Sequence, residues 1–119
     1  MRSLFSTVAA IATLAFATPS EAQVFNNHGT VSATRKGDKV TVVVAGKGDW
    51  HVNMEYDIKV TLGDKKLGKA DARYAGGKDG KADSATFETS EKASSGEVKA
   101  VFCDAHSCTA PMKIGFQVK

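Results

Sequence analysis

Two cysteines separated by four residues are the side chains in this sequence best suited to chemistry. They are the first and last residues of the segment Cys103-Asp104-Ala105-His106-Ser107-Cys108. In an oxidising compartment two nearby thiols can join in a disulfide. A protonated His106 would favour the thiolate form of either cysteine, whereas the carboxylate of Asp104 would oppose it. The sequence therefore predicts a cysteine pair whose reactivity His106 and Asp104 modulate.

The spacing leaves three interpretations of the cysteine pair open. As a structural staple, it closes a loop of six residues, which stabilises a fold by only about 2 kcal/mol on the chain-entropy model. It cannot be the bridge between two sheets of an immunoglobulin domain, which needs a long separation. As a redox site, it would be a short-loop disulfide, and strained, exposed disulfides exchange readily with other thiols. The third interpretation is metal ligation.

A scattered set of soft ligands is the basis of the metal interpretation. Imidazole, thioether and thiolate groups suit copper. His51 and Met54 are three positions apart, so on a strand their side chains would point to opposite faces. Zinc would need four ligands with more regular spacing. Exposed histidines and core methionines explain the same residues without a metal. The candidate ligands beside the cysteines are His51, His106, Met54 and Met112.

Alternation of apolar and polar residues predicts β-strands along most of the chain. Apolar side chains recur at every second position in several segments, which is the period of a half-buried strand. The clearest segments are 40–44, 56–62, 98–102 and 113–119, with weaker ones at 29–34, 67–74 and 82–89.

Turn residues separate these strands. Gly37-Asp38 suits a tight hairpin between the first two of them, and glycine-rich breaks follow at 46–49, 63–66 and 75–80. About seven short strands at this spacing predict an all-β, immunoglobulin-like antiparallel β-sandwich. The cysteines would lie on a hairpin near the end of the chain.

The first 22 residues have the pattern of a signal peptide. Arg2 precedes an apolar run from Leu4 to Ala17, and small residues at Ser20 and Ala22 mark a cleavage site before Gln23. The apolar run is shorter than the roughly 20 residues that span a membrane. We therefore expect a signal peptide at 1–22 and one domain at 23–119, periplasmic or secreted, soluble after cleavage and monomeric.

Composition excludes several classes of protein. The chain has 119 residues, with 16 Lys+Arg against 13 Asp+Glu, 42% hydrophobic and 24% charged residues. This balance argues against disorder, and the length against a large multidomain enzyme. The lysines are not clustered with aromatic residues, so we expect no nucleic-acid partner. No nucleophile elbow or carboxylate pair indicates a hydrolase.

Residues 49–119 resemble the N-terminal periplasmic domain of the thiol–disulfide interchange protein DsbD. The resemblance lies in Trp50-His51-Val52-Asn53 before the 56–62 strand, in Val101-Phe102-Cys103 followed by Cys108, and in Pro111. Here four residues separate the cysteines, where we expect about five in that family. Thr109-Ala110-Pro111 replaces its aromatic-Pro-Pro sequence.

This resemblance implies an immunoglobulin-like domain whose cysteine pair exchanges electrons with other exported proteins. It implies that Cys108 reacts with partners and that Cys103 resolves the mixed disulfide. It also implies an aromatic shield for the disulfide, for which Tyr74 is the candidate.

The function expected is thus thiol–disulfide interchange, in which case the chain is a thiol–disulfide oxidoreductase without a bound cofactor. Its partners would be periplasmic redox proteins or a membrane electron donor. The alternatives are an exported binding module with a structural hairpin disulfide, and a copper-binding carrier.

Overall fold

The computed structural model describes residues 22–25 and 28–119, which form an almost entirely β structure. The predicted signal peptide lies outside the described residues except for Ala22, where β1 (Ala22–Phe25) begins. Helical structure in the described part of the chain is limited to one 3-10 turn, η3 (Lys69–Asp71). No helix among these residues has the length and apolar character needed to cross a membrane.

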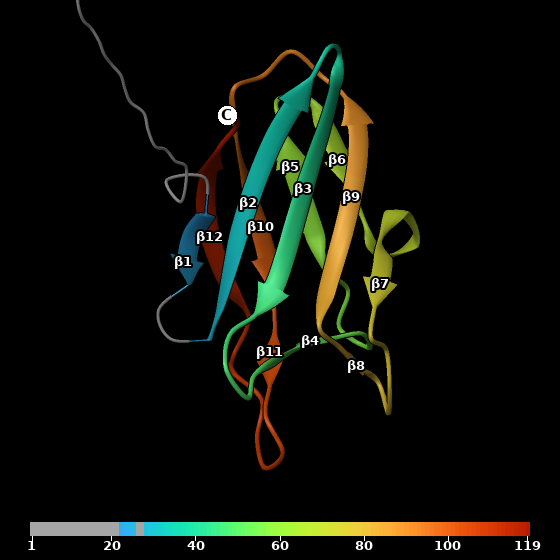
Figure 1. Cartoon of the computed structure of the whole chain (residues 1–119), viewed down its shortest axis with the longest axis vertical. Coiled ribbons are helices and arrows are strands. Elements are labelled where there is room, and N and C mark those ends of the chain that lie inside the picture. The colour runs from blue at the N-terminus through green and yellow to red at the C-terminus, as the bar shows by residue number, and fades with distance from the viewer. Residues whose placement is uncertain (1–21, 26–27) are drawn as a thin grey trace, which may run out of the picture.

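The first sheet has five antiparallel strands and forms the front layer in Figure 1. β2 and β3 form a hairpin in which Lys36 pairs with Lys39 across Gly37 and Asp38. Gly37 has a φ of +63°, a conformation that glycine adopts without a steric penalty. The predicted hairpin is confirmed. Beyond β1, the strand order is β2 (Gly29–Lys36), β3 (Lys39–Gly46), β9 (Ser84–Ser90) and β7 (Arg73–Ala75).

The second sheet has four antiparallel strands and lies behind the first in Figure 1. Its centre is β10, which pairs with β12 on one side and with β5 on the other. The strand order is β12 (Met112–Gln117), β10 (Ser95–Ala100), β5 (Lys59–Leu62) and β6 (Lys65–Leu67).

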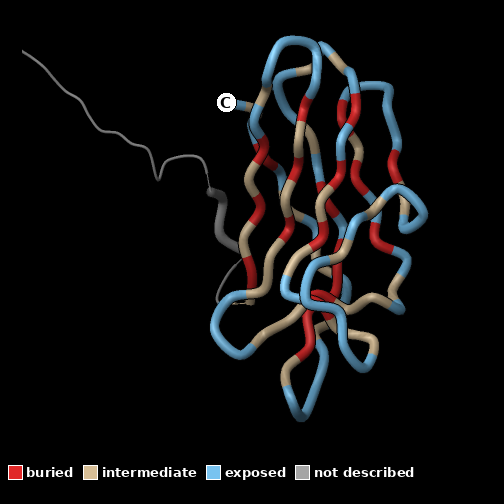
Figure 2. The backbone as a smooth tube through the Cα atoms, turned by 45° about the vertical axis from the view of Figure 1, so that its right-hand side comes forward, coloured by how far each residue is buried: buried red, intermediate tan, exposed pale blue. Residues whose placement is uncertain are grey.

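The hydrophobic core lies between these two sheets. Val42 of β3 and Phe87 of β9 are fully buried, as are Val60 of β5 and Val98 of β10. Figure 2 shows buried positions alternating with more exposed ones along the strands of both layers. Alternation of this kind places one face of each sheet in the core. The predicted all-β, immunoglobulin-like antiparallel sandwich is therefore confirmed.

A third, small sheet closes one end of the sandwich and carries the cysteines. It pairs β11 (Phe102–Cys103), β4 (His51–Asn53) and β8 (Lys81–Ala82). Phe102 lies opposite Val52, and both side chains are buried. In Figure 1 this sheet lies at the lower end of the molecule, and the chain after β11 projects beyond it.

The prediction of about seven strands was wrong, because the described chain contains twelve. The 67–74 segment is divided into the end of β6, η3 and the start of β7. β5 begins only at Lys59, because the Ile58 amide bonds to the Tyr56 carbonyl in a turn. Strands of two or three residues are too short to show a period of two in the sequence.

Candidate functional site

The two cysteines face each other across a hairpin that extends β11. Cys103 and Cys108 form an antiparallel bridge. On one side of them the Thr109 amide donates to the Phe102 carbonyl at 2.8 Å, and on the other the Asp104 amide donates to the Ser107 carbonyl at 2.8 Å. The cysteines thus occupy a non-hydrogen-bonded pair, where facing side chains come closest. Their Cα atoms are 3.9 Å apart and their sulfurs form a disulfide.

The side chain of Asp104 holds the turn of this hairpin. Its Oδ1 accepts hydrogen bonds from the backbone amides of His106 at 2.8 Å and Ser107 at 2.7 Å. Those bonds, first from His106 and then from Ser107, lower the pKa of the Asp104 carboxyl below its ordinary value of 3.8. The carboxylate is therefore charged at neutral pH, close to both cysteines.

Cys103 and Cys108 differ in their exposure to solvent. Cys103 is 1% exposed and lies opposite His51 in the small sheet. Cys108 is exposed on the returning arm of the hairpin. Solvent therefore has access to Cys108 but hardly any to Cys103.

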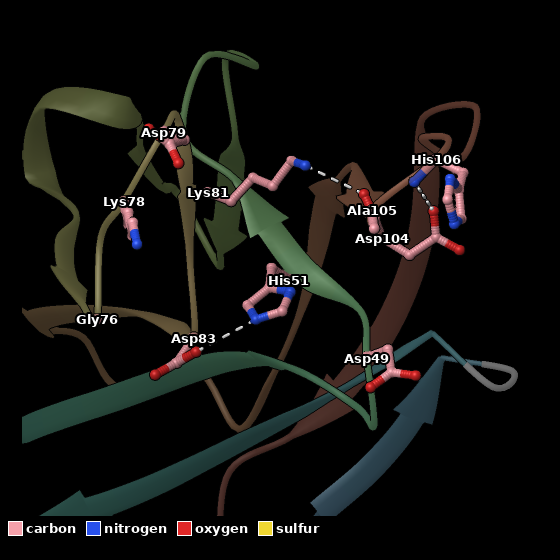
Figure 3. A pocket seen from close by; sticks show the side chains of 10 residues that line it. All are labelled: Asp49, His51, Gly76, Lys78, Asp79, Lys81, Asp83, Asp104, Ala105 and His106. Atoms are coloured by element: carbon pink, nitrogen blue, oxygen red, sulfur yellow. Dashed lines mark hydrogen bonds and ion pairs between the residues drawn. The ribbon is translucent and has the colours of Figure 1, made fainter.

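His106 lies in the exposed turn, two residues before Cys108. Figure 3 shows its imidazole beside the Asp104 side chain, at the rim of a cavity. The charge of His106 also favours the ionised form of Asp104. The hairpin therefore brings together four of the residues predicted for the site, which are Cys103, Cys108, His106 and Asp104.

A cavity of about 570 Å³, lined mainly by residues with titratable side chains, lies beside the cysteine hairpin. In Figure 3 its wall includes Asp49 and His51 from the segment at β4, Asp83 from the segment after β8, and Asp104 and His106 from the hairpin. His51 Nε2 lies 3.6 Å from Asp83 Oδ1. The cavity joins three segments that are far apart in the sequence, and its surface is rich in charged groups.

Lys81, in the wall of this cavity, forms a hydrogen bond with the cysteine hairpin. The Lys81 ammonium group donates to the Asp104 carbonyl at 3.1 Å. The sequence predicts only a glycine-rich break at 75–80 in this region, and it identifies neither Lys81 nor Asp83 as part of a site. Their positions depend on the pairing of β8 with β4, in which Asn53 lies opposite Lys81. No local pattern in the sequence signals that pairing.

The residues proposed as metal ligands are only partly brought together. His51 and His106 line the same cavity, but Met54 and Met112 are not among its lining residues. The Met54 sulfur lies against Gly77, and Met112 packs against the core. Among residues 28–119, no group of three or more His, Cys, Asp or Glu side chains is arranged to hold a metal ion.

Tyr74, the candidate shield, lies on β7 opposite Ala85 of β9. Its ring packs against the core cluster, and its hydroxyl is buried without a hydrogen-bond partner in the described part of the chain. Burial, together with the charge of Asp57, raises the pKa of this hydroxyl above its ordinary value of 10.0. The structure therefore places Tyr74 in the edge strand of the first sheet, and its shielding role stays a prediction.

Comparison with known proteins adds no relative. No protein-family model, curated protein or solved structure matches the chain.

Proposed function

We propose that this protein is an exported thiol–disulfide interchange protein that acts through Cys103 and Cys108. The observation that carries the proposal is the unequal exposure of the two cysteines within one hairpin disulfide. Exchange requires one sulfur that a partner can reach and a second that leaves and later returns. The resemblance of residues 49–119 to the N-terminal domain of DsbD, which includes the same two cysteines, is a second support.

The reaction begins at the exposed sulfur. A thiolate of a reduced partner attacks Sγ of Cys108, the disulfide breaks, and Cys103 leaves as a thiolate with the bonding electron pair. Cys108 and the partner are then joined in a mixed disulfide. The second thiolate of the partner attacks its own bonded sulfur and releases Cys108 as a thiolate. The partner is oxidised, the Cys103–Cys108 pair is reduced by two electrons, and solvent protonates the thiolates.

The reverse sequence passes two electrons from reduced Cys103 and Cys108 to a partner disulfide. The Cys108 thiolate attacks the partner, and the Cys103 thiolate then attacks Cys108 to release it. Because the hairpin holds both cysteines opposite each other, the second step is intramolecular and favoured by proximity. The proposed partners are periplasmic redox proteins or a membrane electron donor, and the chain needs no bound cofactor for either direction.

Single cysteine variants test this proposal. In reduced Cys103→Ser the remaining Cys108 thiol is exposed, and we expect it to form a stable mixed disulfide with Ellman's reagent. In Cys108→Ser the remaining Cys103 thiol is buried, and we expect its reaction to be at least about tenfold slower, because reactivity follows access. Cys108→Ser should also abolish exchange with protein dithiols while leaving the fold intact.

Circular dichroism of both variants is the matched control for folding. Equal, slow labelling of the two folded variants would contradict the proposal. Unfolding of Cys108→Ser at ambient temperature would instead identify the disulfide as a structural staple.

The cavity beside the hairpin favours a second candidate function, an exported binding module. In that case the charged wall formed by Asp49, Asp83 and Asp104 would receive part of a partner, and the disulfide would only fix the hairpin. This candidate predicts a disulfide that resists reduction in the folded protein. The labelling and reduction experiments therefore distinguish it from the exchange protein.

A further inference from the structure

We infer that the outer face of the second sheet docks an acidic surface of the exchange partner. The feature that indicates this is a row of three lysines across neighbouring strands. Lys99 of β10 is paired directly with Lys113 of β12 on one side and with Lys59 of β5 on the other. We call these residues the lysine row. The inference rests on the proposed exchange function and specifies the chemistry of the partner.

The lysine row faces solvent. Each of its members alternates with side chains that pack in the core, such as Val60 beside Lys59 and Val98 beside Lys99. Since successive side chains of a strand point to opposite faces, the three lysines share the outer face of the sheet. All three are exposed. Neighbouring strands are about 4.8 Å apart, so the row spans about 10 Å.

The positive charge of the row is only partly neutralised. Lys59 Nζ lies 3.5 Å from Asp57 Oδ2, whereas Lys99 and Lys113 form no ion pair with any residue that the structure describes. Glu97 lies on the same face, two positions before Lys99 and opposite Thr61. Like charges placed directly opposite each other destabilise a sheet. The lysine row therefore departs from the usual preference against pairing like charges, and departures of this kind occur at functional sites.

Protection of a sheet edge does not explain the central lysine. Lysine on an edge strand prevents unwanted pairing with other chains, and β12 is such an edge. β10, however, has a partner strand on both sides. Lys99 therefore lies where no edge needs protection.

The row lies close to the cysteine hairpin. Lys99 precedes Cys103 by four residues and Lys113 follows Cys108 by five, so the chain separates them by at most about 14 and 18 Å. Figure 1 shows β10 running down to β11, and β12 starting from the same end. A typical interface covers about 800 Å² per partner, or about 30 Å across. A protein that contacts Cys108 can therefore also cover the row.

A protein partner fits this face better than a membrane. Within the paired strands the row is flanked by Thr61, Glu97 and Gly115. The apolar Val101, two residues after Lys99, is only 6% exposed, so it is not available to insert into a bilayer as large apolar side chains do. Carboxylates on a docking partner would match the row and would speed the encounter at low ionic strength.

The test compares two synthetic dithiol peptides that share one reactive core and differ in their flanks, one carrying glutamates and the other serines. Mass spectrometry follows reduction of the Cys103–Cys108 disulfide in the wild type and in Lys99→Gln/Lys113→Gln. At low salt we expect the glutamate peptide to react about tenfold faster with the wild type than with the variant. The difference should vanish near 1 M salt, where the screening length falls to about 3 Å. The serine peptide should react equally with both proteins.

Matched controls separate docking from exchange. Lys36 ends β2 and Lys92 lies between β9 and β10, at the end of the sandwich opposite β11 in Figure 1, and both are exposed. Lys36→Gln/Lys92→Gln therefore removes the same charge elsewhere and should behave as the wild type. A fluorescent glutamate peptide without cysteine measures docking alone by anisotropy. Failure of both dithiol peptides to reduce a wild type that still binds this peptide would overturn the exchange function but not the docking face.

Two outcomes would overturn the docking face itself. The first is equal rates and equal peptide binding for the wild type and Lys99→Gln/Lys113→Gln. The second is binding to phosphatidylglycerol vesicles that depends on Lys99 and Lys113 while the glutamate peptide shows no preference, because this would identify a membrane as the occupant.

Discussion

At the scale of single residues, the carboxylate of Asp104 sets the shape of the turn between the cysteines. One of its oxygens accepts hydrogen bonds from the backbone amides of both His106 and Ser107. Short polar side chains are favoured in turns because they bond to backbone amides that otherwise lack a partner. The same carboxylate adds negative charge near the thiols, which opposes thiolate formation. Asp104 therefore stabilises the hairpin, and in the proposed exchange function we expect it to restrain the reactivity of the thiols.

The amide protons of His106 and Ser107 should report the titration of Asp104. Its pKa in the folded protein lies below the ordinary 3.8. The carboxylate therefore stabilises the hairpin above pH 3.8, and this contribution is lost as the pH falls through the lower folded pKa. By NMR we expect both amide signals to shift with a midpoint below 3.8. Asp104→Asn keeps an acceptor that does not titrate, so the shift should be absent. A midpoint at or above 3.8 would contradict this role.

Two buried polar atoms stand outside the proposed chemistry. Tyr74 Oη and His28 Nδ1 are buried without a hydrogen-bond partner among the described residues. The ring centroids of His28 and Trp50 are 4.5 Å apart in an edge-to-face arrangement. Buried polar groups are rarely left unpaired. We have no physical account of either atom.

At the scale of elements, the sequence predicts long strands well and short strands poorly. Alternation in the 40–44 and 113–119 segments corresponds to β3 and β12. It fails at β11, because Val101, Phe102 and Cys103 are all buried in succession. A run of buried residues carries no period of two, so its pairing with β4 is not visible in the sequence. The cysteine hairpin was predictable, whereas the sheet that anchors it was not.

Gly46 determines how closely the chain can fold back to start β4. A Cβ atom at this position would collide with the backbone carbonyl of Trp50. To relieve this collision the backbone at Gly46 or at Trp50 would have to shift. We therefore expect Gly46→Ala to lower the free energy of unfolding by about 1–3 kcal/mol. Urea denaturation measures the change. Gly68→Ala is the matched control, because nothing lies within 4 Å of a Cβ there. Equal midpoints for the two variants would contradict this account of the turn.

At the scale of the whole molecule, the sandwich provides a core whose stability depends little on the disulfide. The disulfide closes a loop of only six residues, which is worth about 2 kcal/mol, against a typical total of about 5–15 kcal/mol for a domain. The cluster of buried residues between the two sheets includes neither cysteine of the hairpin, and the buried Cys103 lies in the small third sheet. We therefore expect the fold to survive reduction, as an exchange protein requires.

The sequence predicts which site residues lie together when they are close in the chain, but not when strand pairing brings them together from distant segments. Cys103, Asp104, His106 and Cys108 are neighbours in sequence, so their association in one hairpin could be predicted. The cavity could not, because Asp49, Asp83 and Asp104 converge only after β4 pairs with both β8 and β11. The lysine row likewise depends on the register of three strands, which no single segment specifies.

The reduction potential of the Cys103–Cys108 pair tests the central claim most directly. Residues 23–119 are equilibrated with glutathione buffers of different ratios, and the oxidised fraction is measured by mass spectrometry after acid quenching. The exchange function predicts a potential between about −180 and −270 mV, the range of known exchange proteins. A potential below about −300 mV, typical of structural disulfides, would contradict it and favour the binding module.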